Sequence, residues 1–224
     1  MASEGSVLLL DKPLGWTSFD VVKKLRWAVA DKKAGHAGTL DPLASGLLII
    51  CTGKKTKEIS QFQEMEKEYT GTFLLGKTTP SYDAETEVTE EKDTSHIKPE
   101  MVEEVCKGFL GHQEQIPPAY SAAMVNGKRA YSLSRKGKEV ILEPRSIIIY
   151  EFDTDCSTLP FIQFRVVCSK GTYIRSLVHD IGQKLGCGAY LTELRRTRIG
   201  KYKVEDAKTP LLMLEELKAH AGLS

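Results

Sequence analysis

The residues best suited to chemistry lie together in Gly35-His36-Ala37-Gly38-Thr39-Leu40-Asp41-Pro42 and its continuation Leu43-Ala44-Ser45-Gly46. The one carboxylate of this stretch, Asp41, is enclosed by glycines and followed directly by a proline. Glycine lets the backbone approach a ligand closely, and Pro42 biases Asp41 away from helical geometry. A loop of this kind can hold a carboxylate at a fixed angle, so it offers the chemistry of one positioned acid.

An ordinary structural role competes for the same aspartate. Asp41 is also a good helix N-cap with Pro42 at the first helical position. The apolar run of residues 43–50 would then form the helix. Taken alone, the pattern favours this cap over a catalytic role.

A second stretch, Cys168-Ser169-Lys170-Gly171-Thr172-Tyr173-Ile174-Arg175, predicts a strand that passes through a glycine into a helix. Arg175 falls in the first turn of that helix, where the helix dipole favours anions. Its guanidinium therefore needs a nearby carboxylate as a partner. The alternative is a surface ion pair of little energetic value.

Two tyrosines offer aromatic faces near these stretches. Tyr69 lies in a predicted strand, and Tyr173 lies beside Arg175. An RNA base could stack on either ring. By default, however, each tyrosine is a core side chain whose hydroxyl group is hydrogen-bonded.

No motif for a cofactor or a metal stands out. We expect no phosphate-binding loop, no dinucleotide-binding glycine pattern after the first strand and no nucleophile elbow. The five histidines form no H-x-x-x-H pair, and the five cysteines form no C-x-x-C pair. We therefore expect a protein without metal or cofactor, whose thiols are reduced and buried.

The elements that would position these residues alternate between α and β. Period-2 patterns and apolar runs predict strands at residues 7–10, 67–75, 146–152 and 161–168. Helical spacing and caps predict helices at residues 18–30, at 99–109, after Gly171 and from Pro210. The order lacks the regular rhythm of a doubly wound fold, and no linker divides it. We therefore expect one α/β domain over residues 1–224.

Charge is segregated along a chain of 224 residues whose formal net charge is +1. Acidic residues dominate 81–104, and basic residues cluster at 54–57, 128–138 and 195–203. Phosphate binding depends on the local field, so these clusters permit RNA binding, although a solvated surface explains them equally well. The N-terminus lacks a signal peptide and no apolar run could cross a bilayer, so we expect a cytoplasmic protein.

Several motifs together resemble the TruB family of tRNA pseudouridine synthases along nearly the whole chain. They occur in the family's order, and six such motifs are far more specific than one. The matching stretches are Val7 to Gly15, Gly35 to Pro42, Lys67-Glu68-Tyr69, Gln115 to Ala122, Ser169 to Arg175 and Leu194-Arg195-Arg196.

The resemblance implies a pseudouridine synthase fold, which is a mixed and largely antiparallel central sheet flanked by helices, with a thumb insertion at about residues 115–146. It implies that Asp41 is the nucleophile, that Arg175 pairs with it, and that Tyr69 stacks on the target base. The residues implied to line or support the pocket are His36, Tyr173, Leu194, Lys12 and Pro13. The residues implied to contact RNA are Lys128, Arg129, Arg135, Lys136, Arg195, Arg196 and Arg198.

The family's substrate implies that this chain would isomerise the uridine at position 55, in the T-loop of tRNA. It would act as a monomer, without an obligate protein partner, a cofactor or a metal. Related enzymes carry a further RNA-binding or PUA domain after the catalytic core. Only about twenty residues follow Lys203 here, too few for such a domain.

Two other functions are compatible with the same motifs. The chain could be a tRNA-binding folding chaperone whose catalysis is secondary or lost. It could also be a synthase guided by a separate RNA in a larger particle, although the compact chain weighs against this. Asp41, Tyr69 and Arg175 are all present, which favours the enzyme.

Overall fold

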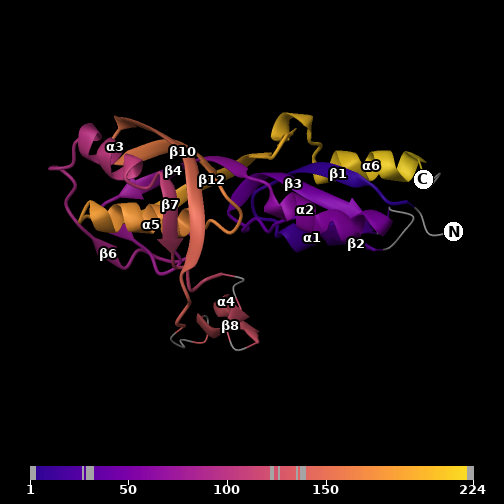
Figure 1. The fold of residues 1–224 in the computed structure, drawn as a ribbon, viewed down its shortest axis with the longest axis horizontal. Coiled ribbons are helices and arrows are strands. Elements are labelled where there is room, and N and C mark those ends of the chain that lie inside the picture. The colour runs from indigo at the N-terminus through magenta and orange to yellow at the C-terminus, as the bar shows by residue number, and fades with distance from the viewer. Residues whose placement is uncertain are drawn as a thin grey trace. The chain divides into compact units, whose positions relative to one another are not determined.

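The computed structural model describes residues 4–26, 28, 33–121, 124–125, 127–134, 136 and 140–220. The chain divides into two compact units. Unit 1 comprises Met1–Tyr69 and Leu194–Ser224, and unit 2 comprises Thr70–Glu193. The chain enters unit 2 within strand β4 (Lys67–Leu75) and leaves it within strand β12 (Ala189–Ile199). Figure 1 labels the elements in chain order.

Unit 1 is built on a sheet whose strand order is β1-β3-β12. β1 (Val7–Lys12) runs antiparallel to β3 (Ala44–Thr52), from Val7 opposite Cys51 to Lys12 opposite Gly46. β3 also pairs with β2 (Ala34–His36) and, in parallel, with β12. β13 (Tyr202–Lys203) extends β12 as a hairpin. The sheet is thus mixed but largely antiparallel.

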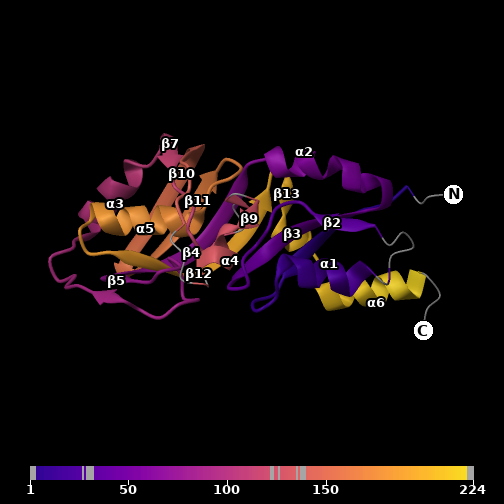
Figure 2. The ribbon, with the colours of Figure 1, turned by 90° about the horizontal axis from the view of Figure 1, so that it is seen from below.

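Helices α1 (Ser18–Arg26) and α6 (Pro210–His220) pack together in unit 1 (Figure 2). A core cluster of buried side chains lies under them: Leu10, Val21, Val22, Leu25, Leu48, Ile50 and Met213. α1 begins with a reciprocal cap, because the backbone N–H of Thr17 donates to Asp20 (2.9 Å) and the N–H of Asp20 donates to the Thr17 hydroxyl (3.0 Å). The remaining elements, η1 (Gly53–Glu58), α2 (Ile59–Glu64) and η2 (Val204–Asp206), are short.

Unit 2 contains a sheet with the order β4-β11-β10-β7. The long strand β10 (Arg145–Thr158) is antiparallel to both β11 (Phe161–Cys168) and β7 (Gly111–Gln115). Helices α3 (Pro99–Lys107) and α5 (Ile174–Lys184) contact each other, and α3 also contacts β10. A small sheet of β5 (Lys77–Thr78) and β6 (Glu90–Glu91) completes the unit.

The thumb insertion predicted at about residues 115–146 leaves the sheet between β7 and β10 (Figure 1). It contains a hairpin of β8 (Met124–Val125) and β9 (Lys128–Arg129), followed by α4 (Ala130–Ser134). Two hydrogen bonds tie α4 to the entry segment: Tyr131 N–H to the Ser121 carbonyl (2.9 Å) and Ser134 Oγ to the Ala119 carbonyl (2.9 Å).

The mixed α and β architecture is confirmed, and two local expectations are corrected. Residues 44–52 form the central strand β3, so the reading of Asp41 as the cap of a helix is wrong. Residues 71–78 match the spacing G-x-x-x-x-G-K-[ST] of a phosphate-binding loop, which the sequence-based expectation overlooked. They form β4 and β5 rather than a loop before a helix, so the match carries no phosphate-binding geometry.

All five cysteines are free thiols, and four are buried: Cys51, Cys106, Cys168 and Cys187. Burial raises the pKa of Cys51 to about 11 and that of Cys106 to about 12. Burial also raises the pKa of the half-buried Cys156. Among the described residues, no helix is both long and apolar enough to cross a membrane.

Candidate active site

The loop that carries Asp41 is fastened at several points within unit 1. The Ala37 N–H donates to the Ile49 carbonyl (2.9 Å), and the Gly15 N–H donates to the Pro42 carbonyl (2.8 Å). The buried Ser18 hydroxyl accepts from the Leu40 N–H (2.8 Å) and donates to the Leu40 carbonyl (3.1 Å). These bonds hold the half-buried Asp41 on both sides, as the glycine and proline pattern predicted.

A buried guanidinium, that of Arg196, holds the same loop from β12. Arg196 is 1% exposed, and its Nε donates to the Leu47 carbonyl at 2.8 Å. Its Nη atoms donate to the carbonyls of Thr39 (3.4 Å) and Gly38 (3.3 Å). The family resemblance implied that Arg196 contacts RNA, but a side chain buried against the Asp41 loop is not available to RNA. We correct that assignment: Arg196 positions the loop.

Gly46 permits the close approach of β3 to β12 that this arrangement needs. Its φ is +105°, and a Cβ atom built there would lie 2.3 Å from the Arg196 carbonyl oxygen. Only glycine fits such a contact in this region of backbone conformation. The parallel register also places Leu194 opposite Ala44, so the predicted pocket residue Leu194 lies beside the strand that follows Asp41.

Lys12 is a second buried cation of unit 1. It is 0% exposed, and its Nζ donates to the carbonyls of Pro13 (2.9 Å) and Trp16 (2.6 Å). Burial lowers the pKa of Lys12 to about 8, although the nearby Asp41 carboxylate acts in the opposite direction. Pro13 itself is exposed. Lys12 thus supports the turn before α1 and places a positive charge near Asp41.

The lowered pKa of Lys12 predicts a specific dependence of stability on pH. Between pH 8 and 10.5 the folded state has released this proton and the unfolded state still binds it, so stability rises with pH in that window. Relative to Lys12→Met, we expect the wild type to gain free energy of unfolding between pH 7 and pH 9.5. Urea titrations at both pH values measure the free energy of unfolding of the two proteins. If the difference between wild type and Lys12→Met is the same at both pH values, the prediction is wrong.

His36 and Tyr69 complete the predicted residues of unit 1. Burial lowers the pKa of His36, and the positive charge of Arg196 lowers it further, against a hydrogen bond with the Gly38 backbone that raises it. Its Nδ1 is buried and has no hydrogen-bond partner among the described residues. Tyr69 is 8% exposed and lies at the end of unit 1 within β4.

Arg175 lies in the first turn of α5 in unit 2, where the sequence placed it, and it is 4% exposed. Its Nε lies 3.5 Å from Oδ2 of Asp83, which is also buried. Its Nη1 donates to the carbonyls of Ser81 (3.1 Å) and Tyr120 (3.0 Å). The reading of Arg175 as part of a weak surface ion pair is therefore wrong.

Asp83 is the charged residue that sequence reasoning missed. Its Oδ1 accepts from the Ser81 hydroxyl (2.6 Å) and from the Glu85 N–H (2.9 Å). Nothing in the sequence separates it from the other acids of residues 81–104, most of which are exposed. The predicted pairing of Arg175 with Asp41 joins residues of different units and stays a prediction.

The backbone before Asp83 is strained and braced by a ring stack. Tyr82 has a φ of +64°, a region that side chains other than glycine, asparagine and aspartate rarely adopt. Its ring stacks on His179 of α5 with the centroids 3.8 Å apart and the planes at 14°. His179 lies one helical turn beyond Arg175. The stack therefore holds the Asp83 loop against the helix that carries Arg175.

The start of α5 is also bound to the entry of the thumb. The buried Gln115 accepts from the Tyr173 N–H at 2.8 Å and donates to the Tyr173 carbonyl at 3.1 Å. The Ser176 hydroxyl donates to the Ile116 carbonyl at 2.7 Å. Together with the bond from Arg175 to Tyr120, these contacts fix the segment from which the thumb leaves the sheet.

The other predicted RNA contacts differ in how available they are. Arg195 forms a bidentate ion pair with Asp11 (2.7 and 3.0 Å), and Arg198 pairs with Glu66 at 2.6 Å. Lys136 is exposed. Lys128 and Arg129 form β9, and Arg135 lies outside the described residues. Within the described ranges, no group of three or more His, Cys, Asp and Glu side chains could hold a metal ion.

Known proteins match this chain over nearly its full length. A model of the TruB family pseudouridylate synthase N-terminal domain matches residues 26–174, and a model of the tRNA pseudouridylate synthase B C-terminal domain matches residues 175–222. The tRNA pseudouridine synthase B of Flavobacterium johnsoniae is 51% identical over 222 residues, which covers 96% of this chain and 97% of the relative. That of Phocaeicola vulgatus is 54% identical over 209 residues, 91% of this chain and 89% of the relative.

Solved structures show the same fold. A chain of a crystal structure of a Cbf5-Nop10-Gar1 complex superposes with a TM-score of 0.73 at 32% identity, and the match covers 97% of this chain and 56% of that one. A chain of an H/ACA RNP bound to a substrate RNA gives a TM-score of 0.71 at 29% identity, with the same coverage. The predicted pseudouridine synthase fold is thus confirmed, and the chain belongs to the TruB family of pseudouridylate synthases.

Proposed function

We propose that this protein isomerises uridine to pseudouridine in tRNA, at position 55 in the T-loop. The observation that carries the proposal is that a member of this family holds Asp41 in a loop fixed by Arg196, Ser18 and Gly15. Relatives more than 50% identical over most of their length are named tRNA pseudouridine synthase B.

In the proposed reaction, the Asp41 carboxylate attacks C6 of the uracil or C1′ of the ribose, because covalent capture needs an anion and no metal. The bond between N1 and C1′ breaks, the base turns while it is held, and C5 bonds to C1′. C5 loses its proton and N1 gains one, so atoms and electrons balance without a co-reactant. Tyr69 stacks on the base, and Arg175 keeps Asp41 ionised and oriented.

The uridine must leave its stack to reach Asp41. Extrusion costs a few kcal/mol, less for a loop nucleotide than for one in a duplex. His36, Tyr173 and Leu194 line the pocket that receives it, and Lys12 and Pro13 support the wall. The thumb residues Lys128, Arg129, Arg135 and Lys136 grip the stem, and Arg195 and Arg198 contact phosphates when their ion pairs open.

We further propose that the chain works as a cytoplasmic monomer. It needs neither an obligate protein partner nor a cofactor. The roles of Tyr69, Arg175 and the RNA-contacting residues rest on the family resemblance together with the placement described above.

The test is tritium release from a tRNA transcript labelled with [5-³H]uridine, with the purified chain alone. We expect release from the uridine transcript and none attributable to position 55 from a transcript with cytidine there. Tight binding of the transcript without release would favour the folding chaperone. Release only after addition of a second RNA would favour a guided synthase.

Arg196→Met separates the loop-positioning role from the phosphate-contacting role first predicted for Arg196. Losing two bonds to the Asp41 loop and one to β3 should lower kcat about 100-fold, because small displacements of a reacting group have effects of that size. KM and the salt dependence of tRNA binding should stay near wild type, and Arg196→Lys should recover part of kcat. Steady-state tritium release measures both constants. An unchanged kcat with a raised KM would instead show that Arg196 acts in RNA binding, as first predicted.

A further inference from the structure

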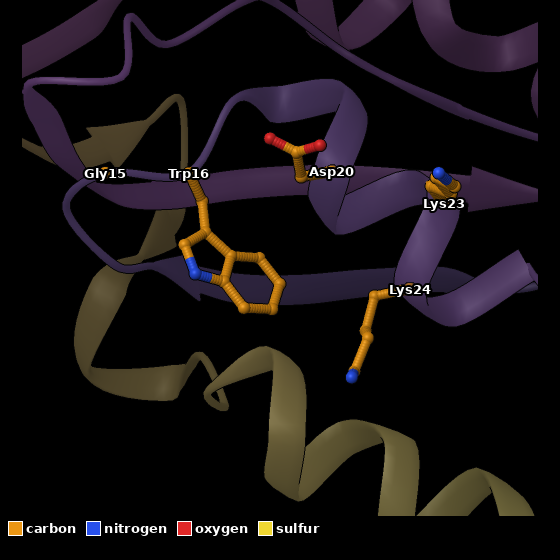
Figure 3. A pocket seen from close by; sticks show the side chains of 5 residues that line it. All are labelled: Gly15, Trp16, Asp20, Lys23 and Lys24. Atoms are coloured by element: carbon orange, nitrogen blue, oxygen red, sulfur yellow. The ribbon is translucent and has the colours of Figure 1, made fainter.

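An open groove lies beside α1 in unit 1, and none of the proposed catalytic residues lines it. It encloses about 520 Å³ and is lined by Gly15, Trp16, Asp20, Lys23 and Lys24. Figure 3 shows the indole of Trp16 and the side chain of Lys24 extending in the same direction. The carboxylate of Asp20 points the opposite way. We call this site the α1 groove.

The α1 groove has the charge of an anion-binding surface. Lys23, Lys24 and Arg26 lie in the last turns of α1, against the single acid Asp20, and both lysines are exposed. Asp20 is committed to the helix cap, where it accepts from the Thr17 N–H (2.9 Å) and the Thr17 hydroxyl (2.6 Å). Those hydrogen bonds, led by the one from the hydroxyl, lower the pKa of Asp20.

The aromatic wall of the groove is rigid. Trp16 is half-buried and packs against the core cluster under α1 and α6, so one part of its indole is anchored and another part faces the groove. Its carbonyl accepts from the buried Lys12. An anchored aromatic ring is a good stacking platform for a nucleic-acid base, worth about 1–3 kcal/mol per base in single-strand binders.

The groove begins where the catalytic loop ends. Gly15 lines the groove, and its N–H donates to the carbonyl of Pro42, the residue after Asp41. At the other side of Trp16, Ser18 exchanges two hydrogen bonds with Leu40, the residue before Asp41. The groove therefore adjoins the loop that carries Asp41.

We propose that the α1 groove binds the RNA strand beside the target uridine, with a base against Trp16 and phosphates at Lys23 and Lys24. This inference rests on the proposed function, since it takes the RNA at Asp41 as the occupant. The groove would act in binding rather than in chemistry. Substitutions in the groove should therefore raise Kd and KM and leave kcat unchanged.

The first experiment compares the wild type with Lys23→Gln/Lys24→Gln. Equilibrium binding of tRNA and of an isolated T stem-loop is measured over a series of salt concentrations. We expect Kd to rise at least about fivefold for both RNAs, and the slope of log K against log[salt] to fall by about 1.4, the value for two phosphate contacts of a single strand. The matched control is Lys98→Gln/Lys107→Gln, two exposed lysines in unit 2.

The second experiment addresses the indole. Trp16→Phe keeps an aromatic ring and should bind within about twofold of wild type, whereas Trp16→Leu should lose about five- to tenfold in affinity. Both variants are checked by urea unfolding. If Trp16→Leu does not fold, the binding measurements on the variant of the two exposed lysines still test the inference.

Three outcomes would overturn the inference. In the first, the lysine variant has the Kd and the salt slope of the wild type. In the second, the control pair of lysines loses as much affinity for RNA as the groove pair. In the third, the lysine variant loses affinity for full tRNA but not for the stem-loop. Tritium release by the wild type is measured in parallel, so failure of the proposed function is seen separately. A different result is that the wild type releases no tritium while the lysine variant still loses affinity for RNA. That result would support RNA binding in the α1 groove and would contradict the proposed enzymatic function.

Discussion

Asp41→Asn should abolish pseudouridine formation, lowering the rate of tritium release by at least about 10⁴-fold. The amide keeps the size and nearly the shape of the carboxylate but carries no negative charge, so it cannot capture the uridine. The loop is held by the backbone and by Arg196, not by the Asp41 side chain alone, so it should keep its conformation. Affinity for tRNA should therefore stay within a few-fold of wild type.

The matched control for this variant is Asp153→Asn, which removes one carboxylate from the exposed surface of β10. It should release tritium at the wild-type rate. Single-turnover release with enzyme in excess over the transcript removes any effect of product dissociation. Substantial release by Asp41→Asn under those conditions would show that another group is the nucleophile.

Asp83→Asn should destabilise the protein by about 3–5 kcal/mol, because it removes one carboxylate of a buried ion pair, 3.5 Å from the guanidinium of Arg175. Arg175 keeps its hydrogen bonds to the carbonyls of Ser81 and Tyr120 in this variant. Because Arg175 also binds the entry of the thumb, the same change should lower catalysis beyond what the lost stability explains. Urea unfolding gives the free energy, and tritium release well below the denaturant midpoint gives the rate.

A double-mutant cycle with Arg175→Gln isolates the pair. Removing both charges should cost less than the sum of the single changes, since neither buried charge is then left alone. The exposed pair of Arg165 with Asp153 serves as the reference, and Asp153→Asn should change the free energy of unfolding by no more than about 1 kcal/mol. Additive effects at Asp83 and Arg175 would show that their ion pair is not a source of stability.

Much of the framework could be predicted because its elements carry a local signal. The apolar spacing of α1, α3 and α5 and the alternation in β4 show in the sequence without tertiary context. α1 comprises Ser18–Arg26, and the expected extension to residue 30 includes residues that the structure does not describe. β12 was not foreseen, because arginines and threonine interrupt its apolar residues.

The catalytic loop shows why a pattern alone did not suffice. The run after Asp41 is apolar throughout, and a short apolar run is compatible with either a buried strand or a helix. The competing cap and helix were therefore a fair reading until β3 was found between β1 and β12. The resemblance to a family, carried by several motifs at once, is what singles out Asp41 as the proposed nucleophile.

The buried charges could not be predicted from the sequence. Arginine and aspartate are rarely buried unless paired, so Arg196 and Asp83 were assigned to the surface with their neighbours. Their burial depends on partners distant in the chain, such as Leu47 for Arg196 and Arg175 for Asp83. No local pattern records such a contact.

The thiols of this protein have a practical consequence for labelling. A thiol with a pKa of about 11, such as Cys51, is ionised in roughly one molecule in ten thousand at pH 7, and burial shields it further. A new cysteine at an exposed site with an ordinary pKa of about 8.5 would be ionised roughly three hundred times more often. Lys23→Cys could therefore receive a maleimide dye or a photocrosslinker in preference to the four buried cysteines, once the half-buried Cys156 is replaced by serine.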